Sequence, residues 1–88
     1  MKKILICGAG GFIGGHLVSY FKKKSNVEII CADIKPKNFW FQLYEDLNNY
    51  SLDLKDYNHA LKVTQNIDYI FNFACNMGGM GFIENNKA

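Results

Sequence analysis

The sequence has little proline and no long hydrophobic run. Pro36 is the only proline among 88 residues, and neither an internal repeat nor a low-complexity tract is present, so the chain is expected to form one unit. The opening MKKILIC imitates an export signal, but its apolar run covers only residues 4–7. A signal needs roughly 7 to 15 apolar residues, and a membrane span needs about 20. We therefore expect a cytoplasmic protein without a membrane partner.

Arginine is absent and the charge is nearly balanced. Ten lysines face eight acidic residues, which gives a formal net charge of +2, and the lysines are scattered along the chain. This pattern argues against a nucleic-acid partner. The three cysteines, Cys7, Cys31 and Cys75, are odd in number and widely spaced, so neither a disulfide framework nor a metal site is indicated. A reducing compartment and no bound metal are expected.

Segments typical of strands and helices alternate along the chain. Strands are predicted at residues 4–7, 27–32, 50–52 and 68–73. A helix is predicted from residue 12 to about residue 24, with an inward stripe of Ile13, Leu17, Tyr20 and Phe21. A second helix follows Leu54, and its expected inner face comprises Tyr57, Ala60, Leu61 and Thr64. The segment FWFQLYEDL, residues 39–47, fits either a short helix or an irregular excursion.

This alternation predicts an α/β fold. Strand, helix, strand, excursion, strand, helix, strand is the order that produces a parallel sheet with right-handed crossovers. We expect the first half of a Rossmann-type doubly wound sheet, with about four strands in the order 3-2-1-4. In such a sheet a ligand binds in the crevice at the carboxyl ends of strands 1 and 4.

A glycine-rich turn, CGAGGFIGG at residues 7–15, lies between the first strand and the first helix. Gly8, Gly11 and Gly14 satisfy the spacing GxxGxxG, whereas GxGxxG would need a third glycine where Ile13 stands. Glycines in such a turn let backbone amides and the helix N-terminus face a pyrophosphate. Because the turn follows a strand and opens an amphipathic helix, dinucleotide binding is favoured over a plain glycine-rich turn.

Two acidic residues follow later strands. Asp33 lies 19 residues after Gly14, close to the roughly 20 at which a carboxylate reaches the adenosine ribose. A carboxylate there repels a 2′-phosphate and favours NAD over NADP, although nearby Lys35 leaves NADP open and a solvated strand-end aspartate is the alternative. Asp53 could accept a hydrogen bond from the adenine amino group or could equally cap a helix that starts near Lys55.

These residues together resemble the extended short-chain dehydrogenase/reductase superfamily. CGAGGFIGGHL is similar to its TGxxGFIG opening, with Cys7 where threonine is usual, and Asp33, the pair Asp53 and Leu54, and residues 73–75 also match. Within the superfamily, IDYIFNFACNMGGMGFIENN resembles the GDP-mannose 3,5-epimerases, which carry a nearly identical VFNLAADMGGMGFI run. The resemblance covers the whole chain but only about the first quarter of such an enzyme.

The resemblance implies a set of site residues. Gly78 would touch the sugar-nucleotide substrate, and Cys75 and Asn76 depart from the alanine and aspartate that are common in those epimerases. The residues implied in NAD binding lie along the pyrophosphate, the ribose, the adenine and the middle of the cofactor: Gly8, Gly10, Gly11, Phe12, Ile13, Gly14, Asp33, Ile34, Lys35, Asp53, Leu54, Phe73, Ala74 and Cys75.

The resemblance also implies an activity. The complete enzyme would be an NAD-dependent epimerase, a homodimer, that converts GDP-mannose into GDP-L-galactose or GDP-L-gulose through a 4-keto sugar. The superfamily's catalytic YxxxK motif belongs to a helix beyond the fifth strand. The only match here, Tyr20 to Lys24, is interpreted as a decoy because it lies on the first helix, with Tyr20 facing inward.

We therefore expect residues 1–88 to be a truncated NAD-binding Rossmann domain that lacks the catalytic residues and the substrate domain and is inactive alone. Two alternatives stay open. The parent could be another NAD-dependent sugar-nucleotide epimerase or dehydratase, or the chain could be a non-catalytic NAD-binding module.

Overall fold

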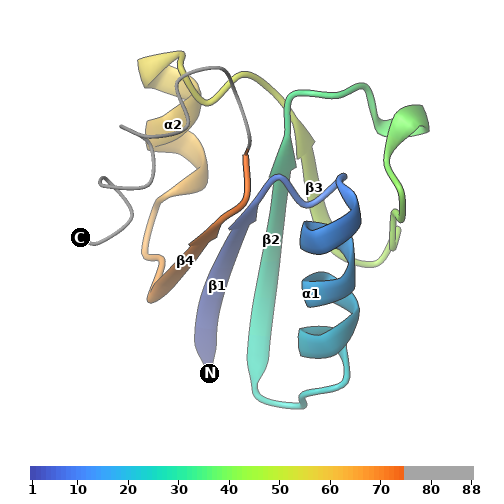
Figure 1. Ribbon diagram of the computed structural model, residues 1–88. Helices are drawn as coiled ribbons and strands as arrows, with labels where there is room; N and C mark the ends of the chain where they lie inside the picture. Colours follow the sequence, from blue (N-terminus) through green and yellow to red (C-terminus); the bar gives the residue numbers. More distant parts are fainter. Residues whose placement is uncertain (75–88) are drawn as a thin grey trace.

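Residues 1–74 form a parallel four-stranded sheet with a helix on each face (Figure 1). The computed structural model describes residues 1–74, so the predictions for Cys75, Asn76 and Gly78 concern positions outside the described residues. The sheet order is β3-β2-β1-β4, which confirms the predicted α/β fold and the predicted order 3-2-1-4. Its elements, in chain order, are β1 (Lys2–Cys7), α1 (Phe12–Lys22), β2 (Val27–Asp33), the 3-10 helix η1 (Lys37–Phe39), β3 (Asn48–Ser51), α2 (Tyr57–Val63) and β4 (Tyr69–Asn72).

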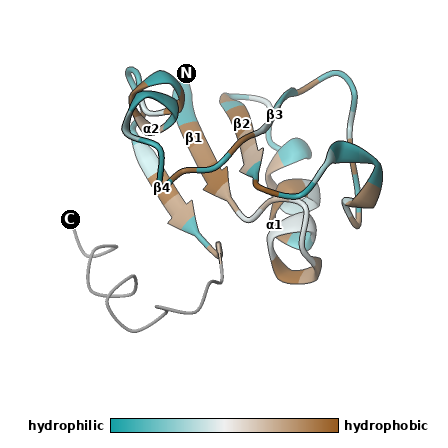
Figure 2. Cartoon of the chain, turned by 90° about the horizontal axis from the view of Figure 1, so that it is seen from above, coloured by the Kyte–Doolittle hydropathy of each residue, from teal (hydrophilic) through white to brown (hydrophobic). Residues whose placement is uncertain are grey.

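The two central strands are apolar on both faces, as a sheet covered on both sides requires. Alternate residues of β1 point to opposite faces, so Ile4 and Ile6 pack with Val18 of α1, whereas Leu5 and Cys7 pack with Val63 of α2. Figure 2 shows the hydrophobic residues of β1 and β2 lying between the two helices. The two faces therefore hold two separate cores, one under each helix.

Helix α1 approaches the sheet with small residues, and this corrects the predicted inward stripe. Its buried residues are Gly14, Gly15 and Val18. Leu17 and Phe21 are partly buried against the core as predicted, but Ile13 is 64% exposed and Tyr20 is 53% exposed. The prediction was wrong for these two because it followed the helical period of the large apolar residues and did not count the glycines as part of the buried face. The glycines let α1 approach its neighbours closely, since a Cβ on Gly14 would meet the backbone of Gly8 in the turn after β1.

Helix α2 is short and its buried face is also rotated from the prediction. Val63 is its buried residue, and Tyr57 and Leu61, both predicted to face inward, are 74% and 43% exposed. Successive helical residues are separated by 100°, so a face centred on Val63 cannot also include Leu61. The helix begins at Tyr57 because the Asp56 side chain accepts hydrogen bonds from the backbone amides of Asn58 and His59.

The segment between β2 and β3 is irregular after η1, which selects the second of the two structures allowed by the sequence. Trp40 is buried there, while Phe39 and Phe41 are exposed. Strand β3 begins at Asn48, two residues before the predicted start, because Asn48 and Asn49 pair in parallel register with Ile30 and Cys31. Neither helix within residues 1–74 is long enough and apolar enough to cross a membrane.

Candidate functional site

The glycine turn after β1 is held by very close backbone contacts. Gly8 has a φ of +81°, which favours glycine, and a Cβ at this position would lie 2.6 Å from the backbone carbon of Phe73. A Cβ on Gly14 would collide with the carbonyl oxygen of Gly8. Gly8 donates its amide proton to Ala32 at 2.8 Å. These contacts bring the ends of β1, β2 and β4 and the start of α1 together at one edge of the sheet.

The amino end of α1 is open at this edge. Gly11 is the N-cap, no side chain within residues 1–74 caps the helix there, and the first turn contains no acidic residue. A Cβ on Gly11 would make only an ordinary contact, 3.5 Å from the Gly8 carbonyl oxygen. Phe12 and Ile13 are 63% and 64% exposed. The positive end of the helix dipole and its first amides are thus available to an anion.

Asp33 ends β2 with its carboxylate directed at the glycine turn. It is a buried acidic residue, and its Oδ2 accepts a hydrogen bond from the Gly10 amide at 2.8 Å. Its Oδ1 accepts one from the Lys35 amide at 3.0 Å. A carboxylate offers about four acceptor positions, so each oxygen keeps capacity for one further donor. Ile34 and Lys35 continue the chain as exposed residues at the same edge.

Asp53 and Leu54 follow β3 at this edge. The Asp53 Oδ1 accepts a hydrogen bond from the Lys55 amide at 2.9 Å and does not cap α2, since Asp56 does. The alternative in which Asp53 is an N-cap is therefore wrong. Leu54 packs against the core under α2.

Phe73 and Ala74 follow β4. Phe73 donates its amide proton to the Cys7 carbonyl at 2.8 Å and its side chain is 39% exposed. The Ala74 amide is bonded to the Asn72 side chain at 3.2 Å. All described site residues predicted from the sequence thus follow the carboxyl ends of strands or open α1. Cys75 and Gly78 lie outside the described residues.

The two described cysteines, Cys7 and Cys31, are buried and are expected to be unreactive. Burial, followed by the negative charge of Asp33, raises the pKa of the Cys7 thiol to about 11. Burial raises the pKa of the Cys31 thiol to about 12. Both side chains therefore stay protonated near neutral pH and supply neither a nucleophile nor a metal ligand. Within residues 1–74, no group of His, Cys, Asp and Glu could hold a metal ion.

Trp40 and Gln42 contact the glycine turn and were missed by the sequence analysis. The Trp40 ring lies against Gly10, and the Gln42 Nε2 donates to the Ala9 carbonyl at 3.1 Å. From the sequence, Trp40 was expected only to pack, as aromatic residues generally do. Nothing in its pattern identified the glycine turn as the surface on which this tryptophan packs.

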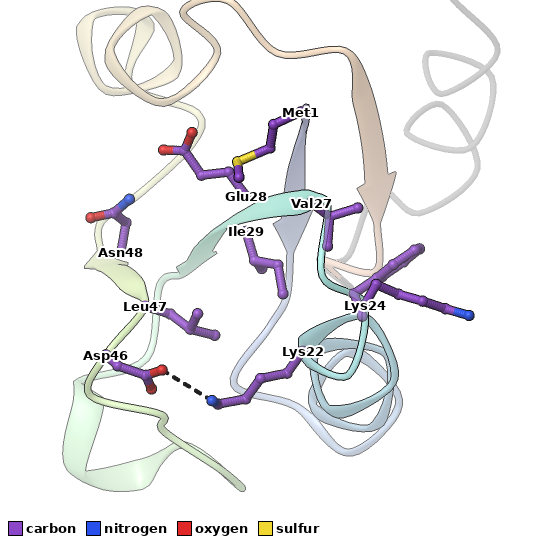
Figure 3. A pocket seen from close by; sticks show the side chains of 10 residues that line it. Met1, Lys22, Lys24, Val27, Glu28, Ile29, Asp46, Leu47 and Asn48 are labelled. Atoms are coloured by element: carbon purple, nitrogen blue, oxygen red, sulfur yellow. Dashed lines mark hydrogen bonds and ion pairs between the residues drawn. The ribbon is translucent and has the colours of Figure 1, made fainter.

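Tyr20 and Lys24 lie away from this edge. Tyr20 lies in the last turn of α1 and Lys24 lies just beyond its C-terminal end. The Lys24 Nζ lies 4.8 Å from the centroid of the exposed Tyr20 ring. A cavity of about 260 Å³ lies nearby, at the amino ends of the strands, lined by Met1, Phe21, Lys22 and Asp46 among others (Figure 3). Its volume is below the roughly 300 to 1,000 Å³ typical of ligand pockets. It shares no residue with the candidate site at the carboxyl ends.

Comparison with known proteins identifies sequence relatives across the chain. Residues 4–87 match the NAD dependent epimerase/dehydratase family. The chain is 40% identical to GDP-mannose 3,5-epimerase 1 of Oryza sativa subsp. indica and 39% identical to GDP-mannose 3,5-epimerase of Arabidopsis thaliana. Each match covers 98% of this chain and 22% of the relative, so the chain spans about a fifth of the length of these relatives.

Solved structures share the fold. A short-chain dehydrogenase/reductase superfamily protein of Agrobacterium tumefaciens with bound NAD matches with a TM-score of 0.70 at 14% identity, over 88% of this chain and 21% of that chain. The UDP-Glc/GlcNAc 4-epimerase of Campylobacter jejuni matches with a TM-score of 0.69 at 28% identity, over 97% and 28% of the two chains. Because the family match extends over nearly the entire sequence, the chain belongs to the NAD dependent epimerase/dehydratase family.

Proposed function

We propose that this chain is the NAD-binding portion of a nucleotide-sugar epimerase. NAD is the cofactor of the family to which the chain belongs. The observation that carries the proposal is the open amino end of α1 beside the buried Asp33 carboxylate, at the carboxyl edge of a parallel sheet. That combination provides amides for a pyrophosphate and an acceptor for ribose hydroxyls at a position where such folds bind dinucleotides.

The described residues fit the cofactor in three respects. The space in front of Gly11 is free of the close contacts found at Gly8 and Gly14, so a phosphate can approach its backbone. Phe12 and Ile13 present the first amides of α1, and Asp33 retains acceptor capacity on both oxygens. Asp53 and Leu54 are assigned to the adenine end, and Phe73 and Ala74 to the middle of the cofactor. When bound, NAD supplies reversible hydride acceptance from a sugar carbon.

GDP-mannose is the proposed sugar nucleotide. Support comes from the 40% identity to a GDP-mannose 3,5-epimerase over nearly the whole chain. The proton-transfer groups are proposed to lie outside residues 1–74, because Tyr20, the tyrosine of the only YxxxK match, lies in the last turn of α1 and not at the carboxyl edge. Gly78 is proposed to contact the sugar nucleotide, and Cys75 is proposed to contact the cofactor. The expectation that the complete enzyme is a homodimer stays a prediction.

A second candidate is another sugar-nucleotide epimerase or dehydratase of the same family. The 28% identity to a UDP-Glc/GlcNAc 4-epimerase, over 97% of this chain, supports it. Both candidates bind NAD and differ in the sugar nucleotide, so a substrate test separates them.

The first experiment measures NAD binding by calorimetry with the purified protein. We expect saturable binding of NAD, and the Asp33→Ala variant should bind NAD at least tenfold more weakly and discriminate less against NADP. Unchanged selectivity would remove Asp33 from its role, and an absence of NAD binding would refute the proposal. Incubation of the complete enzyme with GDP-mannose should then yield GDP-galactose or GDP-gulose. Turnover of a UDP-linked or dTDP-linked sugar instead would favour the second candidate.

A further inference from the structure

Trp40 is buried against the glycine turn although it belongs to the irregular segment after η1. Only 8% of its surface is exposed. A Cβ on Gly10 would lie 2.6 Å from Cγ of the Trp40 ring and 3.0 Å from the Asp33 Oδ2. The ring and the carboxylate therefore share the space over the Gly10 α-carbon. Gly10 is required here by the tryptophan and the aspartate.

The backbone of Lys35 connects the same two side chains. Its amide donates to the Asp33 Oδ1 at 3.0 Å, and its carbonyl oxygen accepts a hydrogen bond from the Trp40 Nε1 at 2.9 Å. The same carbonyl accepts a second hydrogen bond from the Ser51 hydroxyl at the end of β3, at 2.8 Å. The Asp33 carboxylate is thereby fixed at one oxygen through Gly10 and at the other through Lys35.

The two residues after Trp40 attach the segment to the turn at further points. The Phe41 amide donates to the Gly10 carbonyl at 2.7 Å. The Gln42 Nε2 donates to the Ala9 carbonyl at 3.1 Å, and a Cβ on Gly15 would lie 3.0 Å from the Gln42 Cγ. Residues 40–42 thus form a brace along the glycine turn, and Trp40 is its one buried side chain that contacts the Asp33 network.

We propose that Trp40 is a positioning residue of the dinucleotide site, which holds the Asp33 carboxylate in the orientation that accepts the ribose hydroxyls. The proposal rests on the proposed NAD function and adds to it a residue from the loop between β2 and β3. Without the ring, the space over Gly10 opens and the Asp33 side chain gains other rotamers. Only a fraction of the protein then has the Asp33 carboxylate in the orientation that binds the ribose hydroxyls, which lowers the affinity for NAD.

The test is a double-mutant cycle on NAD affinity, measured by calorimetry with the purified protein. Trp40→Ala should weaken NAD binding about tenfold when Asp33 is present. In an Asp33→Ala background the same substitution should weaken binding less than threefold, because the carboxylate through which Trp40 acts is gone. Trp40→Phe keeps a ring over Gly10 and loses the hydrogen bond to Lys35. Its NAD affinity should stay within threefold of the wild-type value.

Phe39→Ala is the matched control, since Phe39 is an adjacent aromatic residue that is 67% exposed, and it should bind NAD as the wild type does. Circular dichroism checks that each variant is folded at the temperature of the titration, and Trp40→Leu replaces Trp40→Ala in the cycle if the alanine variant unfolds. An equal loss of affinity in both backgrounds would show a general structural role and overturn the proposal. Wild-type affinity in Trp40→Ala would overturn it while leaving the NAD function intact, whereas a wild-type protein that binds no NAD would overturn the proposed function itself.

Discussion

The Asp33 Oδ2 and the Gly10 amide nitrogen lie 2.8 Å apart although 23 residues separate them in the sequence. This hydrogen bond joins the end of β2 to the turn after β1. The Gly10 amide is consequently engaged by a side chain of the protein and contributes to the proposed site by orienting Asp33. A change at either residue is therefore transmitted to the other.

The glycines of the turn should separate into those needed by the fold and those needed by the ligand. Gly14→Ala should lower the free energy of unfolding by about 1 to 3 kcal/mol, because its Cβ meets the Gly8 carbonyl oxygen. Gly11→Ala should cost less than about 1 kcal/mol, a loss of N-cap preference, yet weaken NAD binding by at least tenfold. Urea unfolding and calorimetry measure the two effects. A Gly11→Ala variant that binds NAD normally would remove Gly11 from the phosphate site.

Alanine substitution of Asp53 and of Asp56 should affect different properties of the protein, NAD affinity in the first case and stability in the second. Asp56→Ala should lower the free energy of unfolding by about 1 kcal/mol, because Asp56 caps the helix, and leave NAD affinity unchanged. Asp53→Ala should weaken NAD binding with a smaller effect on unfolding, since Asp53 caps no helix. The same pair of measurements tests both variants. Loss of NAD affinity in Asp56→Ala alone would reverse the assignment.

Tyr20→Phe should leave NAD binding and turnover within about twofold of the wild type. Tyr20 is 53% exposed on α1, and its ring faces the Lys24 ammonium 4.8 Å away. Removal of the hydroxyl leaves this cation–π contact in place. Steady-state assays of the complete enzyme check the result, and a hundredfold loss of turnover would mean that the motif from Tyr20 to Lys24 acts in catalysis.

Alkaline pH should destabilise the fold through the two buried thiols. Their folded pKa values, about 11 for Cys7 and about 12 for Cys31, exceed the ordinary value of 9.0. At pH values between the unfolded and the folded pKa of a thiol, the unfolded chain has lost a proton that the folded chain retains. The thiols therefore leave the free energy of unfolding unchanged below about pH 9 and lower it as the pH rises above 9. The effect is about 1.4 kcal/mol per pKa unit for each thiol.

Urea unfolding at pH 8 and pH 10.5 measures this dependence. The matched control is the variant Cys7→Ala with Cys31→Ala, which should lose less stability between the two pH values than the wild type. Iodoacetamide at pH 8 should also modify neither thiol in the folded protein, as shown by peptide mapping. Rapid labelling of Cys7 would contradict its burial.

The order of the sheet, and the position of the proposed site residues at the carboxyl ends of its strands, could be predicted because they depend on local patterns. The apolar run of β1, the glycine turn and the position of Asp33 each report a feature within a short stretch of chain. Helix faces were predicted less well. Ile13 and Tyr20 have the size of core residues but are exposed, whereas Gly14 lies against the Gly8 carbonyl of the turn after β1.

Long-range contacts explain the remaining differences. Trp40 packs on Gly10 because Phe41 and Gln42 attach to the turn some 30 residues earlier in the chain, and no local pattern encodes that attachment. The sequence also left open whether Asp53 caps α2, and the structure shows Asp56 as the cap. Asp53 and Asp56 are both suitable caps, and the choice depends on where the chain leaves β3.

The hydrogen bond from Trp40 to the Lys35 carbonyl closes a small ring of chain between the two residues, within which Phe39 also bonds to Pro36. The number of residues in this ring is fixed, because an added residue would separate the Trp40 Nε1 from the Lys35 carbonyl oxygen. Natural insertions and engineered tags should therefore be rejected between residues 36 and 39 and accepted at the exposed turn of Glu45 and Asp46. We therefore expect the loop between β2 and β3 to keep a constant length next to the glycine turn and to vary in length around Glu45 and Asp46.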